Sequence, residues 1–205
     1  MTQSQLPTTP NLSTRLRRLT EGWLTRIGAL LHRWGVSPDL LTLLGLGFMI
    51  LAAILVARGA LALAAVALVV GMPLDVLDGA VARAMRRNSS FGGVLDSVVD
   101  RYGDLFVLLA LAYYLATRGA FVEMLLVFAT VIGSTQVSYI RARAGAAGMP
   151  CAGGLFSRFE RSILLVLTLL TGWLIPGLLI LAVGSNLTAL HRLWSVYRFS
   201  QTKGL

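Results

Sequence analysis

The chain has 205 residues, 56% of them hydrophobic, and a formal net charge of +9 at pH 7. A mean hydropathy of +0.76 excludes an ordinary soluble domain and indicates an integral membrane protein. The apolar runs are continuous and do not alternate with polar residues, so we expect membrane helices and not lipid-facing strands. The single cysteine, Cys151, cannot form an intrachain disulfide and gives no indication of an oxidising compartment.

The first part of the chain differs in composition from the rest. Residues 1–11 are polar and lack the charged start and apolar core of a secretion signal, so we predict a flexible N-terminus. Over residues 12–35, apolar side chains such as Leu16, Trp23 and Leu30 recur at helical spacing with arginines between them. This pattern predicts an amphipathic helix that lies in the membrane interface. We interpret it as an electrostatic anchor, with direct contact to substrate as the alternative.

Six later stretches have the length and apolarity of membrane helices, which need roughly 20 apolar residues to cross a bilayer. They are Pro38–Ala57, Ala60–Leu77, Gly92–Thr117, Ala120–Ile140, Ser162–Leu174 with its flanks, and Pro176 to about Leu193. The connections between them are short and leave no room for a second domain. The sequence therefore predicts an all-α integral membrane protein in which residues 36–205 form one domain of six transmembrane helices.

The basic residues are unevenly distributed between the two sides of these spans. Sixteen of the eighteen Lys and Arg residues fall at one side, and only Arg58 and Arg118 fall at the other. By the positive-inside rule, both termini face the cytoplasm in a multi-pass protein of the cell membrane, and an even number of spans agrees with this. We expect anionic lipid, and not nucleic acid, to be the partner of this charge.

Four aspartates lie close together between the second and third spans. Asp75 and Asp78 are three residues apart, and Asp96 and Asp100 are four apart, so each pair occupies one helix face. The short connection makes the two helices antiparallel neighbours, and both pairs can then line one cytoplasmic crevice. Buried carboxylates need compensation. Protons, nearby arginines or a divalent cation could supply it, and an all-oxygen ligand set suits Mg²⁺, Mn²⁺ or Ca²⁺.

The small and basic residues around the aspartates favour a phosphate ligand. Gly79, Ala82 and Gly92 let helices or a flat ligand approach closely, and Arg83 can reach a phosphate as a planar fork. Taken singly, these residues are equally typical of helix packing and of positive-inside charge.

Together, these residues resemble a known family signature. The string Asp75-x-x-Asp78-Gly79-x-x-Ala82-Arg83, followed by eight residues and Gly92-x-x-x-Asp96-x-x-x-Asp100, is similar at all eight positions to that of the CDP-alcohol phosphatidyltransferases. The resemblance implies Mg²⁺, or alternatively Mn²⁺, held by Asp75, Asp78, Asp96 and Asp100, with Asp100 also the catalytic general base. It implies that CDP-diacylglycerol is bound by Asp39, Thr42, Gly79, Ala82, Arg83, Ser89 and Gly92. It also implies a homodimer.

The reaction that the resemblance implies also needs an acceptor, an alcohol whose hydroxyl attacks the phosphorus that carries the lipid and displaces CMP. A group of basic residues bears on which alcohol this is. Arg141 and Arg143 end the fourth span, and Arg158 and Arg161 begin the fifth. Positive-inside topology alone could explain them, but clustered arginine also suits a phosphate dianion. The segments "SYIRARA" and "RFER" are similar to a region of bacterial phosphatidylinositol-phosphate synthases, with Arg141 in place of lysine and Gly145 in place of glutamate. We therefore predict a small phosphorylated alcohol as acceptor, with inositol 1-phosphate preferred over glycerol 3-phosphate.

The sequence leaves two alternative functions and the role of Asp104 to be weighed. A cation or proton transporter would also place acids in a membrane protein, but it does not explain the glycine and arginine spacing or why the acids gather at one end. A catalytically inactive homologue would not need all four aspartates. Asp104 continues the face of Asp96 and Asp100, and either supports the site or pairs with Arg101.

Overall fold

The computed structural model describes residues 26–28, 30–31, 33–84, 90–151 and 156–203 of the chain. Over these residues the fold is all-helical, as predicted. The helices are α2 (Pro38–Ala57), α3 (Leu61–Ala84), α4 (Ser90–Ala116), α5 (Phe121–Ala146), α6 (Arg158–Thr171) and α7 (Leu174–Lys203).

Local signals in the sequence explain where two of these helices begin and end. Ser37 caps α2, because its hydroxyl accepts a hydrogen bond from the backbone N–H of Leu40 at 3.2 Å, and Pro38 occupies the first turn. At α6 the Glu160 carboxylate accepts a hydrogen bond from the backbone N–H of Ser157 at 2.8 Å. Gly172 then ends α6 with a φ of 71°, a left-handed conformation that glycine adopts without strain.

The helices pack around one apolar core. α2 contacts α3 and α4, α4 contacts α5, and α6 lies against both α3 and α7. Leu111 and Leu115 of α4, Leu169 of α6 and Leu178 and Leu181 of α7 are all fully buried in this core. Many other leucines and valines are exposed on the outside of the bundle, as expected for a protein whose outer surface faces lipid.

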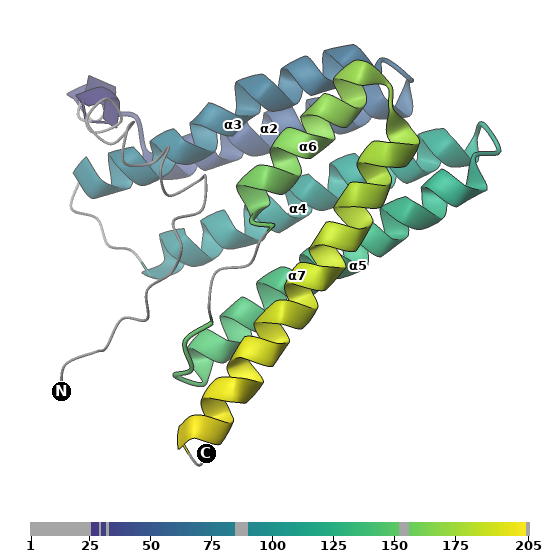
Figure 1. Ribbon diagram of the computed structural model, residues 1–205. Coiled ribbons are helices and arrows are strands. Elements are labelled where there is room, and N and C mark those ends of the chain that lie inside the picture. The colour runs from purple at the N-terminus through teal and green to yellow at the C-terminus, as the bar shows by residue number, and fades with distance from the viewer. Residues whose placement is uncertain (1–25, 29, 32, 85–89, 152–155, 204–205) are drawn as a thin grey trace.

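The pairing of α5 and α7 is close. A Cβ atom added to Gly133 of α5 would lie 2.8 Å from the backbone nitrogen of Asn186 in α7, so only glycine fits there. The Asn186 side-chain amide donates a hydrogen bond across this contact to the carbonyl oxygen of Ala129 at 2.9 Å. The two helices are seen side by side in Figure 1.

Figure 1 also shows which helix ends share a side of the molecule. The end of α3, the start of α4 and the ends of α5 and α7 lie at one side. The short turns that join α2 to α3, α4 to α5, and α6 to α7 lie at the other. The segments that carry the two aspartate pairs therefore lie at the same side of the molecule.

Four of the described helices are long and apolar enough to cross a membrane: Pro38–Ala57, Leu61–Val81, Phe121–Ala146 and Leu174–Thr202. The chain is thus a multi-pass membrane protein by the composition of its helices. The predicted third span is a helix, α4, but it carries Asp96, Asp100 and Asp104. The predicted fifth span, α6, has only 14 residues. The count of six spans, and which side faces the cytoplasm, remain predictions.

The predicted flexible N-terminus and most of the interfacial helix lie outside the described residues. Residues 26–28, 30, 31 and 33 are helical, and Arg26, Ile27 and Leu30 are exposed. Gly28 is buried against α3, where an added Cβ atom would lie 2.8 Å from the carbonyl oxygen of Ala80. The segment before α2 therefore crosses α3 two residues from Asp78.

Candidate active site

The first part of the site joins α2 to α3. The Asp78 side chain is buried, with 6% of the residue exposed, and its carboxylate accepts a hydrogen bond from the Thr42 hydroxyl at 2.7 Å. Thr42 is also buried, and its hydroxyl lies 3.2 Å from the carbonyl oxygen of Pro38, one turn earlier in α2. Sequence reasoning placed Thr42 at the CDP group and Asp78 at the metal, and the structure brings these two residues into direct contact.

The second part of the site lies on α4. Asp96 and Asp100 occupy successive turns of this helix and are both half-buried. Gly92, one turn before Asp96, and Gly79, next to Asp78 in α3, are half-buried as well, whereas Asp39 is exposed in the first turn of α2. The side chains of Asp75, Ala82 and Arg83, and the whole of Ser89, lie outside what the structure describes.

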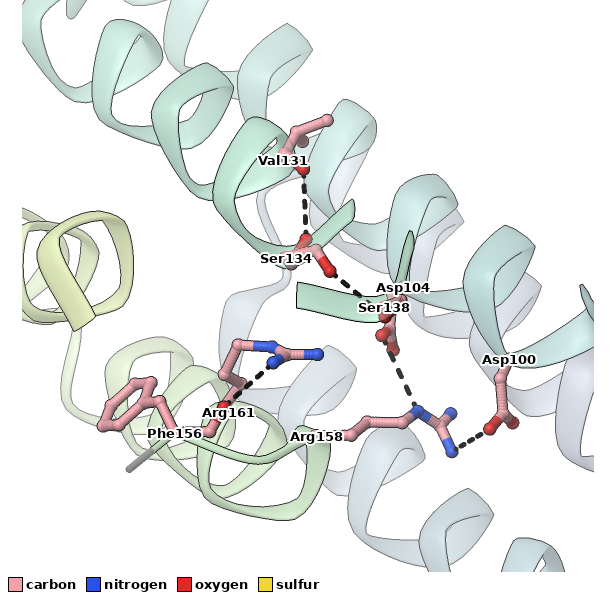
Figure 2. A network of polar contacts seen from close by, with 8 residues as sticks. All are labelled: Asp100, Asp104, Val131, Ser134, Ser138, Phe156, Arg158 and Arg161. Carbon is pink, nitrogen blue, oxygen red and sulfur yellow. Dashed lines mark hydrogen bonds and ion pairs between the residues drawn. The ribbon is translucent and has the colours of Figure 1, made fainter. Parts of the chain in front are cut away.

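The third part comes from α6 and links the predicted aspartates to the arginines predicted for the acceptor. The Nη1 atom of Arg158 lies 2.7 Å from a carboxylate oxygen of Asp100. The Nε atom of the same guanidinium lies 3.6 Å from a carboxylate oxygen of Asp104. Figure 2 shows Arg158 reaching toward α4 between the two aspartates. Arg158, predicted as an acceptor residue, is thus in contact with the predicted general base, and Asp104 pairs with Arg158.

Arg161, one turn further along α6, is buried in the first part of the helix. Its Nη1 atom donates a hydrogen bond to the carbonyl oxygen of Phe156 at 3.1 Å (Figure 2). The negative charge of Asp104 in α4 attracts this buried guanidinium.

The other two arginines predicted for the acceptor lie apart from this contact. Arg141 and Arg143 are exposed on the last turns of α5. Arg141 is close enough to Arg192 of α7 for their charges to repel. The structure therefore brings Arg158 and Arg161 close to the acidic residues of α4, and it places Arg141 within electrostatic reach of Arg192 at the exposed end of α5.

Sequence reasoning missed Arg192. This residue is only 6% exposed, and its Nη1 atom donates a hydrogen bond to the carbonyl oxygen of Val137 in α5 at 2.7 Å. Its charge interacts with those of Arg101 and Arg161. An arginine within an apolar span is itself a signal of a functional site, and this signal could have identified it. Arg101, Arg158, Arg161 and Arg192 form what we name the arginine cluster.

The Nε atom of Arg192 and the Nη1 atom of Arg101 are buried and have no hydrogen-bond acceptor among the described residues. A buried guanidinium donor without an acceptor is costly, and an anion at this position would satisfy it. The arrangement is suited to binding a phosphate group.

The fit of a divalent cation depends on the four aspartates. Among the described side chains, no three acidic, histidine or cysteine residues meet as a ready-made metal site, and the side chain of Asp75 is not among them. The chemistry of the donor set nevertheless fits Mg²⁺ or Mn²⁺, because it offers carboxylate oxygens only. The hydrogen bond from Thr42 orients Asp78 in the way that ligands of metals are commonly oriented.

Comparison with known proteins agrees with these features. Residues 35–194 match the family model described as CDP-alcohol phosphatidyltransferase. The archaetidylinositol phosphate synthase of Pyrococcus horikoshii is 38% identical over 172 residues, which cover 83% of this chain and 89% of that protein.

Solved structures of the Mycobacterium tuberculosis phosphatidylinositol phosphate synthase share the fold. The structure with CDP-DAG bound superimposes with a TM-score of 0.79 at 31% identity, covering 85% of this chain and 93% of that one. The structure in complex with manganese and citrate gives a TM-score of 0.74 at 31% identity, with coverage of 85% and 88%. The resemblance inferred from the signature is thus confirmed, and the chain belongs to the CDP-alcohol phosphatidyltransferase family of enzymes.

Proposed function

We propose that this enzyme transfers the phosphatidyl group of CDP-diacylglycerol to a hydroxyl of inositol 1-phosphate and releases CMP. The observation that carries the proposal is the arginine cluster beside Asp100. In this cluster the charges of Arg101, Arg158 and Arg192 all act on Arg161, and buried donors of Arg101 and Arg192 lack acceptors among the described residues. A phosphorylated acceptor supplies the missing anion, whereas serine or free inositol would not.

The charge balance of this region supports a phosphate dianion. Around Arg161, one carboxylate attracts, that of Asp104, while three guanidinium groups repel, those of Arg101, Arg158 and Arg192, so positive charge is in excess there. Arg141 and Arg143 at the end of α5 add to this excess. The choice of inositol phosphate over glycerol phosphate is supported by the relatives, whose names are those of inositol-phosphate lipid synthases.

A divalent cation would be held by Asp75, Asp78, Asp96 and Asp100. The all-oxygen donor set and the manganese complex of the mycobacterial relative support Mg²⁺ or Mn²⁺ here. When bound, such a cation neutralises the pyrophosphate and stabilises the leaving CMP. The CDP group would lie against Asp39, Thr42, Gly79, Ala82, Arg83, Ser89 and Gly92.

The residues of the chain then perform the following steps. The arginine cluster holds the acceptor phosphate, which brings the acceptor hydroxyl to Asp100 and makes its attack effectively unimolecular. The hydroxyl oxygen forms a bond to the phosphorus that carries diacylglycerol, and the bond between that phosphorus and the CMP oxygen breaks. Asp100 accepts the hydroxyl proton as the new bond forms.

Replacing Thr42 with valine tests the proposed cation site. The substitution keeps the shape of the side chain but removes the hydrogen bond to Asp78. We expect the apparent affinity for Mg²⁺, measured from the cation dependence of CMP release, to fall about tenfold, because the ligand loses its orienting partner. Thr171→Val is the matched control, since the Thr171 hydroxyl is exposed and bonds locally, donating to the carbonyl oxygen of Leu167 and accepting from the backbone N–H of Trp173. A raised KM for CDP-diacylglycerol with unchanged cation dependence would keep Thr42 at the CDP group and contradict its role in orienting Asp78.

The proposal includes a membrane topology and an oligomeric state. All six helices α2–α7 cross the bilayer, with both termini and the active site at the cytoplasmic side, and the protein is a homodimer. The uneven distribution of lysine and arginine supports this orientation. The shared side of the α3 end, the α4 start and the α5 and α7 ends is consistent with it (Figure 1).

The function is tested by measuring CMP release from CDP-diacylglycerol by the purified protein with Mg²⁺. Parallel reactions contain inositol 1-phosphate, glycerol 3-phosphate, free inositol, serine or no acceptor. We expect release with inositol 1-phosphate alone. Release only with glycerol 3-phosphate would make the protein a phosphatidylglycerophosphate synthase. Absence of release with every acceptor would contradict the proposed reaction and return attention to cation or proton transport.

A further inference from the structure

Arg158 is held from two sides by carboxylates on successive turns of α4. Asp100 lies 2.7 Å from its Nη1 atom and Asp104 lies 3.6 Å from its Nε atom, so the guanidinium makes one close ion pair and one longer ion pair with successive turns of α4. About a fifth of each of the Arg158 and Asp104 side chains is exposed, 23% and 21% respectively. Figure 2 shows that the two contacts come from one face of α4, while Arg158 comes from α6.

Asp104 borders two small cavities in the part of the chain that the structure describes. A cavity of about 20 Å³ lies beside it, lined otherwise by Met49, Leu68, Met72, Val107, Ser162 and Leu165. A second cavity of about 30 Å³ is lined by Asp104 together with Thr130, Ser134, Arg161 and Ser162. The carboxylate thus stands between two small spaces, and the cation closest to it in the described residues is Arg158, with Arg161 adding longer-range attraction.

We propose that Asp104 is a positioning residue, which fixes the Arg158 guanidinium against Asp100 and thereby sets the geometry of acceptor binding. This inference rests on the function proposed above, in which Asp100 is the base and Arg158 contacts the acceptor phosphate.

The physical reason is the flexibility of an arginine side chain. Without Asp104, the guanidinium of Arg158 can turn and pair with both oxygens of Asp100, a planar geometry that arginine and carboxylate favour. That arrangement withdraws donors from the acceptor phosphate and occupies the base. Loss of one negative charge also strengthens the long-range attraction of the site for phosphate, but water in an open crevice and salt screen that effect.

The test is a double-mutant cycle on Asp104 and Arg158 in the full-length protein. Asp104→Asn keeps the size of the side chain and removes its charge. Asp104→Glu restores the charge, and the two cavities leave space for the extra methylene group. Ser162→Ala is the matched control, because Ser162 lines both cavities but makes no ion pair with Arg158. Steady-state CMP release gives KM for acceptor and for CDP-diacylglycerol, and thermal unfolding in detergent reports folding.

We expect Asp104→Asn to raise the acceptor KM about tenfold with the KM for CDP-diacylglycerol nearly unchanged. Asp104→Glu should recover most of this loss, and Ser162→Ala should resemble the wild type. In the Arg158→Ala background, Asp104→Asn should change the acceptor KM by less than about twofold, because Asp104 acts through the Arg158 guanidinium, which this background lacks.

The inference would be overturned if Asp104→Asn and Arg158→Ala changed the acceptor KM independently, so that the change in the double variant is the product of the two single changes. A parallel rise in both KM values would also overturn it, as would an Asp104→Glu variant as impaired as Asp104→Asn while still folded. The proposed function is judged separately on the wild type. If the wild type uses glycerol 3-phosphate, the acceptor assignment fails and the cycle is evaluated with that acceptor. If the wild type releases no CMP at all, the reaction fails and this inference fails with it.

Discussion

Replacing Asp100 with asparagine is expected to lower the rate of CMP release by about 10³-fold, because the acceptor hydroxyl loses the group that accepts its proton. Asparagine has the same size, so the packing of α4 against its neighbours is preserved. Binding of CDP-diacylglycerol, measured by titration of the purified protein, should change little. A loss of turnover without a loss of lipid binding would separate the chemical role of Asp100 from a structural one.

The control for this substitution is Glu123→Gln in the first turn of α5. Glu123 is an acidic residue near the opposite end of the helices from Asp100, so the variant removes one carboxylate without touching the site. It should retain the turnover of the wild type. An Asp100→Asn protein with full activity would remove Asp100 from its proposed role. A variant that also fails to bind the lipid would point to a structural defect in the crevice.

Removing divalent cations is expected to have an effect of similar size. The proposed site gathers four carboxylates, and a pyrophosphate cannot approach them closely unless their charge is neutralised. Dialysis against EDTA should therefore reduce CMP release by about a thousandfold, and addition of Mg²⁺ or Mn²⁺ should restore it.

Thermal unfolding of the EDTA-treated protein shows whether the cation is needed for chemistry or for folding. Because the core cluster consists of apolar side chains and includes none of the four aspartates, we expect the protein to remain folded without cation. Full activity after EDTA treatment would contradict the cation site. Activity that is not recovered with either ion, in a protein that remains folded, would contradict the choice of Mg²⁺ and Mn²⁺.

Much of this fold follows from patterns that are local in the sequence. Long apolar runs predict helices because each run must satisfy its own backbone hydrogen bonds in lipid. The starts of α2 and α6 coincide with Ser37 and Ser157, which are common residues at helix N-termini. The spacing of Asp96 and Asp100 predicts that they share a face of α4. Each of these properties depends on residues within one or two turns of a single helix.

The contacts between helices could not be predicted in the same way. The pairing of Arg158 with Asp100 and Asp104 depends on how α6 is seated in the bundle, and sequence spacing carries no information on that. The burial of Arg192 against α5 likewise depends on the close packing of α7 on α5 at Gly133, although the position of this arginine in an apolar span is itself a local signal. The acceptor group inferred from neighbours in the sequence therefore included Arg141 and Arg143 and left out Arg192.

The shortness of α6 has a consequence for the depth at which the reaction takes place. Its 14 residues extend for about 21 Å, against roughly 30 Å for the hydrocarbon layer of a bilayer. In the topology proposed above, with the exposed Trp173 that follows α6 at one boundary, the first turn of α6 would lie below the headgroup level of the other leaflet. Arg158 and Arg161 would then form the floor of a water-filled depression in the membrane. The proposed lipid substrate would enter this depression sideways with its acyl chains still in the bilayer, while the small acceptor and CMP would exchange through the water above.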